Sequence, residues 1–306
     1  MKARPVVPGS VIFLTRRIHK RQFLLRPSER LNKLLEYILA VVAERYEIAL
    51  HAVCVMSNHW HVVLSDPHGS IVDFERDCHS VMARAVNTMY GDFESLWARE
   101  PSCRVQCAEP EDALDKIAYT LANPVEAGLV KFGKDWPGLR FTWARRPRVV
   151  ERPTVFFRDE KAGGRWPKLA TLVCHRPPGF ERHTDDELEA KISAATEARE
   201  LSAREGMHGQ GKRFLGRRGV RKQSRSACAT SDEQRCGARP RVAARSKWAR
   251  IELLQQNDAW LEAYEDAKAR FRGGDSSAVF PFGTWKLRRY YSCLCDPPPD
   301  AIASAA

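Results

Sequence analysis

The chain has 306 residues, of which 43% are apolar and 29% charged, and its formal net charge is +12. No apolar run approaches the roughly 18–20 residues that span a bilayer. Arg16 and Arg17 interrupt the apolar stretch near the N-terminus, so we expect no membrane association and no signal peptide. The basic excess favours an acidic partner, most commonly nucleic acid.

The cysteine content indicates the compartment. The chain has nine cysteines, an odd number, and none of them forms a CxxC pair. Together with the missing signal, this predicts reduced thiols in a cytoplasmic protein. Cys103 with Cys107 and Cys293 with Cys295 could bind a metal, but their spacing is a poor zinc signature.

The first half of the chain alternates strand and helix patterns. β-rich runs predict strands over Val11–Thr15, Ile48–Met56 and His59–Ser65, with turn chemistry at Ser57 and Asn58 between the last two. Apolar residues at helical spacing predict a helix that begins at Ser28 and Glu29 and a second one over Val72–Tyr90, which Gly91 ends.

A third helix is predicted over Glu111–Asn123, because acidic residues occupy its first turn and Pro124 follows its last residue. Arg104–Cys107 is a candidate last strand. This order predicts an α+β fold, with helices packed on a ferredoxin-like, RRM-like antiparallel sheet.

The composition shifts beyond about residue 150. We therefore expect a first domain over residues 1–145 and a mostly helical, basic C-terminal extension over residues 146–306. Helices are predicted over Asp185–Arg204 and Trp248–Phe271. The strongly basic segment 211–246 is typical either of a solvated, partly disordered stretch or of one that contacts phosphates.

The sharpest local feature is the sequence His59-Trp60-His61 inside an apolar strand. Residues two apart on a strand share a face, and their Cα atoms are roughly 6.5–7 Å apart. Two imidazoles at that spacing can bind one cation, while Trp60 points into the core on the other side. The pattern alone is weak, because two histidines can share a strand face without binding metal.

The third helix carries a second polar pair. Its apolar residues Leu114, Ile117, Ala118 and Leu121 gather on one side, and Tyr119 and Asn123 are predicted to project one turn apart from the opposite side, off the core face. Taken by themselves, these two could equally be an ordinary surface tyrosine and a helix-terminal asparagine.

The two features occur together in a known family. The stretch CVMSNHWHVVLSDPHG resembles the HUH motif of the REP-associated, single-tyrosine transposases, and YTLANPVEAGLV, from Tyr119 to Val130, resembles their tyrosine helix. Leu96-Trp97 and Trp136-Pro137 also fit. Two signatures in this order are more specific than either alone. The resemblance covers about residues 8–145.

The resemblance implies the roles of the site residues. His59 and His61 would bind the metal, Asn123 would complete its site, and Tyr119 would be the nucleophile that forms a 5′-phosphotyrosine. It implies Mg²⁺ or Mn²⁺ as the cofactor, although the ligand set alone would also admit Zn²⁺. Single-stranded or hairpin DNA is the implied partner, and both a monomer and a homodimer are compatible with it.

Basic residues must hold the DNA, and five candidates lie within the first domain: Arg16, Arg17, Lys20, Arg21 and Lys116. Their alternative is a solvated charge cluster. Two other functions remain open for the chain: a non-catalytic, domesticated nucleic-acid binder, and a metal-dependent hydrolase with a water nucleophile. Tyr90, Tyr290 and Tyr291 are weaker candidate nucleophiles.

Overall fold

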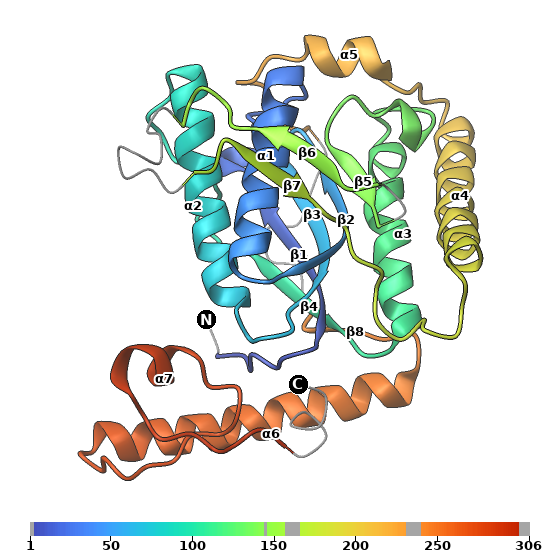
Figure 1. The fold of residues 1–306 in the computed structure, drawn as a ribbon. Helices are drawn as coiled ribbons and strands as arrows, with labels where there is room; N and C mark the ends of the chain where they lie inside the picture. The colour runs from blue at the N-terminus through green and yellow to red at the C-terminus, as the bar shows by residue number, and fades with distance from the viewer. Residues whose placement is uncertain (1–2, 144–145, 157–165, 231–239, 300–306) are drawn as a thin grey trace.

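The computed structural model describes residues 3–143, 146–156, 166–230 and 240–299. Its centre is a six-stranded sheet with helices on both faces (Figure 1). The elements of the first half are β1 (Val11–Arg17), a 3-10 turn η1 (His19–Arg21), α1 (Glu29–Arg45), β2 (Ala49–Val55), β3 (His59–Ser65), α2 (Ile71–Tyr90), β4 (Cys103–Cys107), α3 (Pro110–Glu126), a 3-10 turn η2 (Gly133–Asp135) and β5 (Arg140–Thr142).

The sheet has the strand order β5-β2-β3-β1-β4-β8, where β8 is Val242–Ala243. Strands β1 to β4 pair antiparallel in the order of a ferredoxin-like βαββαβ unit, which confirms the predicted α+β fold. Only β8 among the described strands of this sheet departs from it, by pairing parallel with β4.

Local signals placed most of these elements correctly. Ser28 caps α1 by accepting a hydrogen bond from the Leu31 amide at 3.1 Å. Gly91 ends α2 in the left-handed conformation, at φ +71°. The hairpin turn between β2 and β3 is held by amides from elsewhere, since Ile18 donates to the Asn58 carbonyl and Leu25 to that of Ser57.

The predicted end of the third helix was wrong. Proline does not end α3 at Asn123, because the helix continues through Pro124 to Glu126. Proline removes only the amide that would bond the carbonyl of Thr120, and here it does so in the last turn. Arg140 donates to the next carbonyl, Leu121 O, at 2.7 Å.

The two faces of the sheet have different covers. α1 and α2 lie on one face and bury the main core, which includes Leu14, Trp60, Val62 and Leu64. α3 lies on the other face over a smaller core with Phe13, Val63 and Val105, and α4 (Asp185–Gly209) packs against the outer side of α3 (Figure 1). Helix α3 is therefore enclosed from two sides.

The C-terminal half adds elements around this centre. They are β6 (Arg148–Glu151), β7 (Leu169–Leu172), α4, α5 (Gly216–Lys222), β8, α6 (Lys247–Arg272) and α7 (Lys286–Tyr291). The hairpin of β6 and β7 packs on α1. The helices predicted at Asp185–Arg204 and Trp248–Phe271 are thus present and slightly longer.

The basic segment 211–246 is more ordered than its composition predicts. It contains α5 and β8, while residues 231–239 lie outside the described part of the chain. Val220 of α5 is fully buried in a cluster with Cys54, Met56 and Val125, and the Gly216 amide donates to the carbonyl of Leu129. None of the helices in the described ranges is long and apolar enough to cross a membrane.

Candidate active site

The paired histidines lie at the start of β3, on the face that α3 covers. His61 stands opposite Thr15 of β1 and Cys54 of β2, and His59 stands opposite Arg17. The two imidazole rings are 4.6 Å apart between centroids. Trp60 points to the other face, where its indole is buried in the main core, so the strand alternation places the two histidines side by side as predicted.

Each imidazole is oriented by a neighbour at Nδ1. Asn58 Oδ1 lies 2.7 Å from His59 Nδ1, and Thr15 Oγ1 lies 2.8 Å from His61 Nδ1. The amide oxygen of Asn58 only accepts hydrogen bonds, so His59 Nδ1 donates the proton and Nε2 carries the lone pair. Such contacts at the second nitrogen are the usual way in which metal-binding histidines are held in orientation.

His61 is buried without a partner for its outer nitrogen. It is 4% exposed, and its Nε2 has no hydrogen-bond partner among the described residues. Burial, and secondarily the proximity of His59, lowers the pKa of His61 well below its usual value. The ring is therefore neutral at physiological pH, which is the form that can bind a metal.

Tyr119 of α3 lies directly beside this pair. Its ring centroid is 5.4 Å from that of His61, edge to face, and 5.7 Å from that of Phe13. Phe13 also stacks on His61 at 5.2 Å. The phenylalanine of β1 thus fixes both the histidine and the tyrosine.

Asn123 follows Tyr119 by one helical turn. It is 7% exposed, and its Oδ1 has no hydrogen-bond partner among the described residues. The prediction that Tyr119 and Asn123 project off the core face was wrong, since Tyr119 packs against Phe13 and Asn123 is buried. Tyr119 faces the sheet, where it contacts Phe13 of β1 and His61 of β3, and the helix pattern of α3 alone does not reveal these contacts.

Two cations approach the tyrosine ring. Lys116, one of the predicted DNA-binding residues, places its Nζ 5.9 Å from the ring centroid and forms an ion pair with Asp115 at 3.4 Å. Arg199 of α4, which the sequence did not single out, lies 5.6 Å from the same ring. Arg199 also pairs with Asp115 at 2.6 Å and with Glu126 at 3.2 Å, and so ties α4 to both sides of the tyrosine turn.

The other four predicted DNA-binding residues do not all lie on the same face of the sheet. Arg17 is exposed and stands opposite His59, at the open end of the pair. Lys20 and Arg21 follow in η1 with φ of 49° and 59°, a backbone conformation that non-glycine residues rarely adopt. Arg16 points to the opposite face of the sheet, where its guanidinium lies 5.8 Å from the Trp97 ring.

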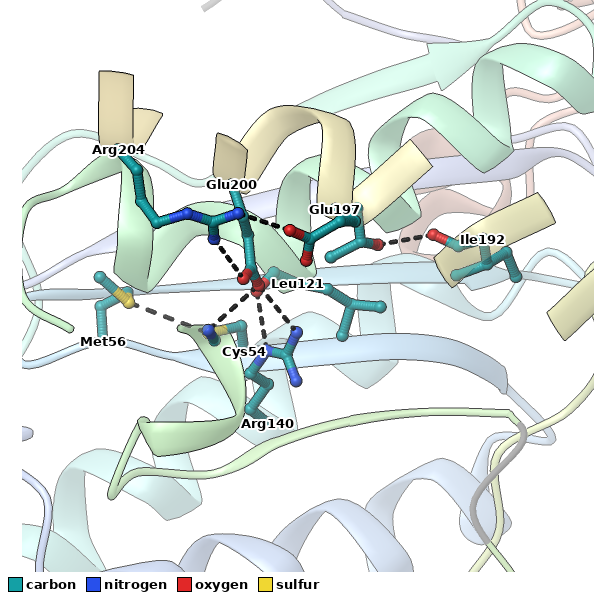
Figure 2. A network of polar contacts seen from close by, with 10 residues as sticks. Cys54, Met56, Leu121, Arg140, Ile192, Glu197, Glu200 and Arg204 are labelled. Carbon is teal, nitrogen blue, oxygen red and sulfur yellow. Dashed lines mark hydrogen bonds and ion pairs between the residues drawn. The ribbon is translucent and has the colours of Figure 1, made fainter. Parts of the chain in front are cut away.

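A polar network fixes the α3 segment between Tyr119 and Asn123 (Figure 2). Arg140 of β5, whose side chain is 21% exposed, donates to the carbonyl of Leu121 and lies 3.7 Å from Glu200 of α4. Glu200 also accepts from the Gly133 amide at 3.1 Å and pairs with Arg204 at 3.5 Å. The network thus joins α3, β5 and α4 beside the site.

The remaining candidates for chemistry lie elsewhere or are already bonded. His51 is buried with both ring nitrogens hydrogen-bonded, His68 pairs with Glu47 at the surface, and His79 is buried beside Trp60. No group of three or more His, Cys, Asp or Glu in the described part of the chain could hold a metal.

The histidine pair with Asn123 fits a divalent cation in its chemistry. The outer nitrogen of His61 and the amide oxygen of Asn123 are buried acceptors with no partner among the described residues. Leaving such a group unsatisfied costs about 1–3 kcal/mol, so it usually marks an unseen ion, water or catalytic role.

The fold and this site define a class: a ferredoxin-like protein with a paired-histidine strand beside a tyrosine helix. Residues 12–102 match the sequence model of the family described as "Transposase IS200 like". The matched segment contains His59 and His61, whereas Tyr119 and Asn123 lie beyond its end.

Two solved structures are similar to parts of the chain. One is a REP-associated tyrosine transposase bound to a REP hairpin, with 18% identity, a TM-score of 0.37, and coverage of 45% of this chain and 78% of that one. The other, assigned as a transposase, is from Deinococcus radiodurans, with 22% identity, a TM-score of 0.28, and coverage of 34% and 84%. No curated protein matches the chain.

Proposed function

We propose that this protein is a transposase that cleaves and rejoins single-stranded DNA, including strands that flank hairpins, through a covalent bond to Tyr119. The observation that supports this most directly is the edge-to-face contact of the Tyr119 ring with His61, at 5.4 Å between centroids. It places a phenol beside a histidine whose outer nitrogen is buried and has no partner among the described residues.

In the proposed reaction the Tyr119 oxygen attacks the phosphorus of a phosphodiester. The bond from phosphorus to the 3′-oxygen breaks, the phenol proton leaves to solvent, and the 3′-oxygen takes up a proton to become a free hydroxyl. The product is a 5′-phosphotyrosine. Because the linkage is again a phosphodiester, a 3′-hydroxyl can attack it, release Tyr119 and join a new strand.

His59, His61 and Asn123 would hold the divalent cation, Mg²⁺ or Mn²⁺. When bound, such an ion supplies charge neutralisation and orientation at the scissile phosphate. The bonds from Asn58 and Thr15 keep the two imidazoles in place before the ion binds. Phe13 fixes the distance between the imidazole of His61 and the phenol.

The cations near the ring have separate roles in this proposal. Lys116 and Arg199 favour loss of the phenol proton, because both lie within 6 Å of the Tyr119 ring. Arg17, Lys20 and Arg21 contact the phosphates that enter at the exposed end of the histidine pair. We further propose that residues 1–145 form the catalytic domain and that residues 146–306 are an extension that supports it through α4.

The test is covalent capture of labelled DNA. The full chain is incubated with a pool of 5′- and 3′-labelled single-stranded oligonucleotides of random sequence, with Mn²⁺ or with EDTA, and complexes that survive denaturation are counted. The native protein should retain the 3′-labelled fragment only with Mn²⁺, and Tyr119→Phe should retain none.

The matched control is Tyr90→Phe, which removes a hydroxyl from a half-buried tyrosine of α2. It should leave adduct formation unchanged. An adduct that survives Tyr119→Phe would overturn the nucleophile assignment. Metal-dependent cutting without any adduct would point to a water nucleophile, and tight DNA binding with no cutting would point to a non-catalytic binder.

A further inference from the structure

A deep groove lies on the other side of the sheet from Tyr119. Its volume is about 1050 Å³, at the upper end of the range for small-molecule sites. One wall is α2 between Val72 and Ala83, a length of roughly 16 Å at 1.5 Å per residue. The opposite wall comes from α6 and α7, which lie beyond the lower end of α2 in Figure 1.

The lining of the groove combines aromatic rings with positive charge. Among the described residues it contains six aromatic side chains, seven cations and two acids. The aromatic residues are Trp97, Trp260, Tyr264, Phe271, Trp285 and Tyr291. Trp260 and Tyr264 are stacked at 5.1 Å with an interplanar angle of 15°, so they present parallel faces.

The two acids are already neutralised. Glu75 is in an ion pair with Arg104 and accepts from the Ser102 hydroxyl, and Glu265 pairs with Lys268 at 2.6 Å. Arg272 and Lys286 are exposed and have no acidic partner among the described residues. The groove therefore carries a net positive charge that an anionic chain can neutralise.

Part of the groove lining is close in sequence to the candidate active site. The groove lining includes Arg16 and Trp97, and Trp97 donates to the carbonyl of His79 at 2.8 Å. Arg16 is adjacent along β1 to Thr15, which bonds His61, and to Arg17, which stands opposite His59. A polymer that lies in the groove can thus pass around the end of β1 to the histidine pair.

His79 adds an unsatisfied acceptor at the same place. It is 7% exposed, and its Nε2 has no partner among the described residues. Burial, together with Arg16 and Arg104, lowers the pKa of His79 to about 3, so the ring is neutral.

We propose that this groove between α2, α6 and α7 binds the single-stranded DNA next to the cleavage point, with bases stacked on its aromatic rings and phosphates on Arg272 and Lys286. Aromatic platforms interleaved with cations are what single strands require, because every base has a stacking face and every linkage a negative charge. A duplex hides its base faces. The inference rests on the proposed function for its substrate class, but the binding site itself does not need Tyr119.

The test measures equilibrium binding of a fluorescent single-stranded 20-mer by the full chain in EDTA, from anisotropy at several salt concentrations. Arg272→Ala with Lys286→Ala should weaken binding at least fivefold. It should also lower the slope of log K against log salt by about 1.4, at about 0.7 per phosphate contact. Tyr291→Ala, at a side chain that is 60% exposed, should weaken binding about tenfold.

Matched controls lie on the same two helices outside the groove. Arg250→Ala with Arg288→Ala removes the same charge from α6 and α7, and Trp248→Ala removes an aromatic ring that is 75% exposed. Both should weaken binding less than twofold. All six side chains are exposed, and equal melting temperatures would confirm that the variants fold.

Photocrosslinking of the same 20-mer carrying 5-iodouracil gives the second readout, and crosslinks should map to Trp260, Tyr264 or Tyr291. Equal losses of affinity in groove and control variants would contradict the proposal that the groove binds single-stranded DNA. Equal affinity for a duplex of the same length would contradict it as well. If the groove variants lose binding and the native protein forms no covalent adduct, the tyrosine chemistry is refuted, whereas the groove is still supported as a DNA-binding site.

Discussion

The two faces of the central sheet use alternate residues of the same strands, yet they differ in the polarity of the side chains that these strands contribute. On the α1 and α2 face, β1 and β3 contribute Leu14, Trp60 and Val62 to a large apolar core. On the α3 face, the same strands contribute Thr15 and His61, whose Nε2 has no partner among the described residues. The first face stabilises the fold, whereas the second carries the candidate active site at a cost in stability.

Within the second face, two histidines show the same contrast. His51 and His61 are both buried, at 1% and 4% exposure. His51 bonds the His175 carbonyl at 2.9 Å and Ser65 Oγ at 2.9 Å, so both of its nitrogens are satisfied. His61 is satisfied only at Nδ1. Burial alone therefore does not separate a structural histidine from a candidate ligand, whereas the hydrogen-bond partners do.

The largest expected effect comes from the apolar face. Trp60→Ala should lower the free energy of unfolding by about 3–5 kcal/mol, because it leaves a cavity in a closely packed core. Urea denaturation measures it, with the exposed His68→Ala as the control expected within about 0.5 kcal/mol. A loss below about 1 kcal/mol would mean that this face is not the stabilising one.

The next effect belongs to the polar face. Mn²⁺ at about 100 times its dissociation constant should raise the free energy of unfolding of the native protein by about 2.7 kcal/mol. His59→Ala with His61→Ala should abolish that increase, and His51→Asn should retain it. If the double variant is stabilised as much as the native protein, the ion binds elsewhere.

The prediction for His51 concerns pH. Burial lowers the pKa of His51 to about 4, below the unfolded value near 6.5. The neutral form is therefore favoured in the folded state, and its contribution is present above pH 6.5 and is lost as the pH falls toward 4.

Between pH 7 and pH 5 this histidine should cost the protein about 2 kcal/mol of stability. The comparison is the change in the free energy of unfolding of native protein and His51→Asn over that interval. The variant should lose about 2 kcal/mol less than the native protein. Identical losses would show that His51 does not contribute to the pH dependence.

The smallest effect is a gain. Asn123→Leu replaces a buried, unsatisfied amide oxygen by an apolar side chain of similar volume. In EDTA it should raise the free energy of unfolding by about 1 kcal/mol, and it should reduce the stabilisation by Mn²⁺. A destabilised variant would show that Asn123 has a structural partner instead.

The sequence predicted correctly those elements whose bounds are determined by their own local residues. The strand His59–Ser65 has the predicted bounds, because its apolar run and the turn before it specify both ends. It also placed His59 and His61 on one face. It gave no indication of β5, β6 and β7, which have three or four residues each and carry too few apolar positions for a period to show.

What the sequence missed depends on contacts between distant segments. Thr15 reaches His61 only through the register of β1 with β3, which no local pattern specifies. Arg199 reaches Tyr119 across 80 positions because α4 packs on α3. Asn123 is buried, although the helix pattern alone had placed it on an open face.

The most direct test of the account is the position of the covalent bond. DNA-bound protein is digested with trypsin after Lys116 and Lys131, the DNA is trimmed by nuclease, and the peptides are sequenced by mass spectrometry. The account predicts a nucleotide on Tyr119 in the peptide 117–131 and on no other tyrosine. A nucleotide on Tyr90, Tyr290 or Tyr291, with Tyr119 unmodified, would contradict it.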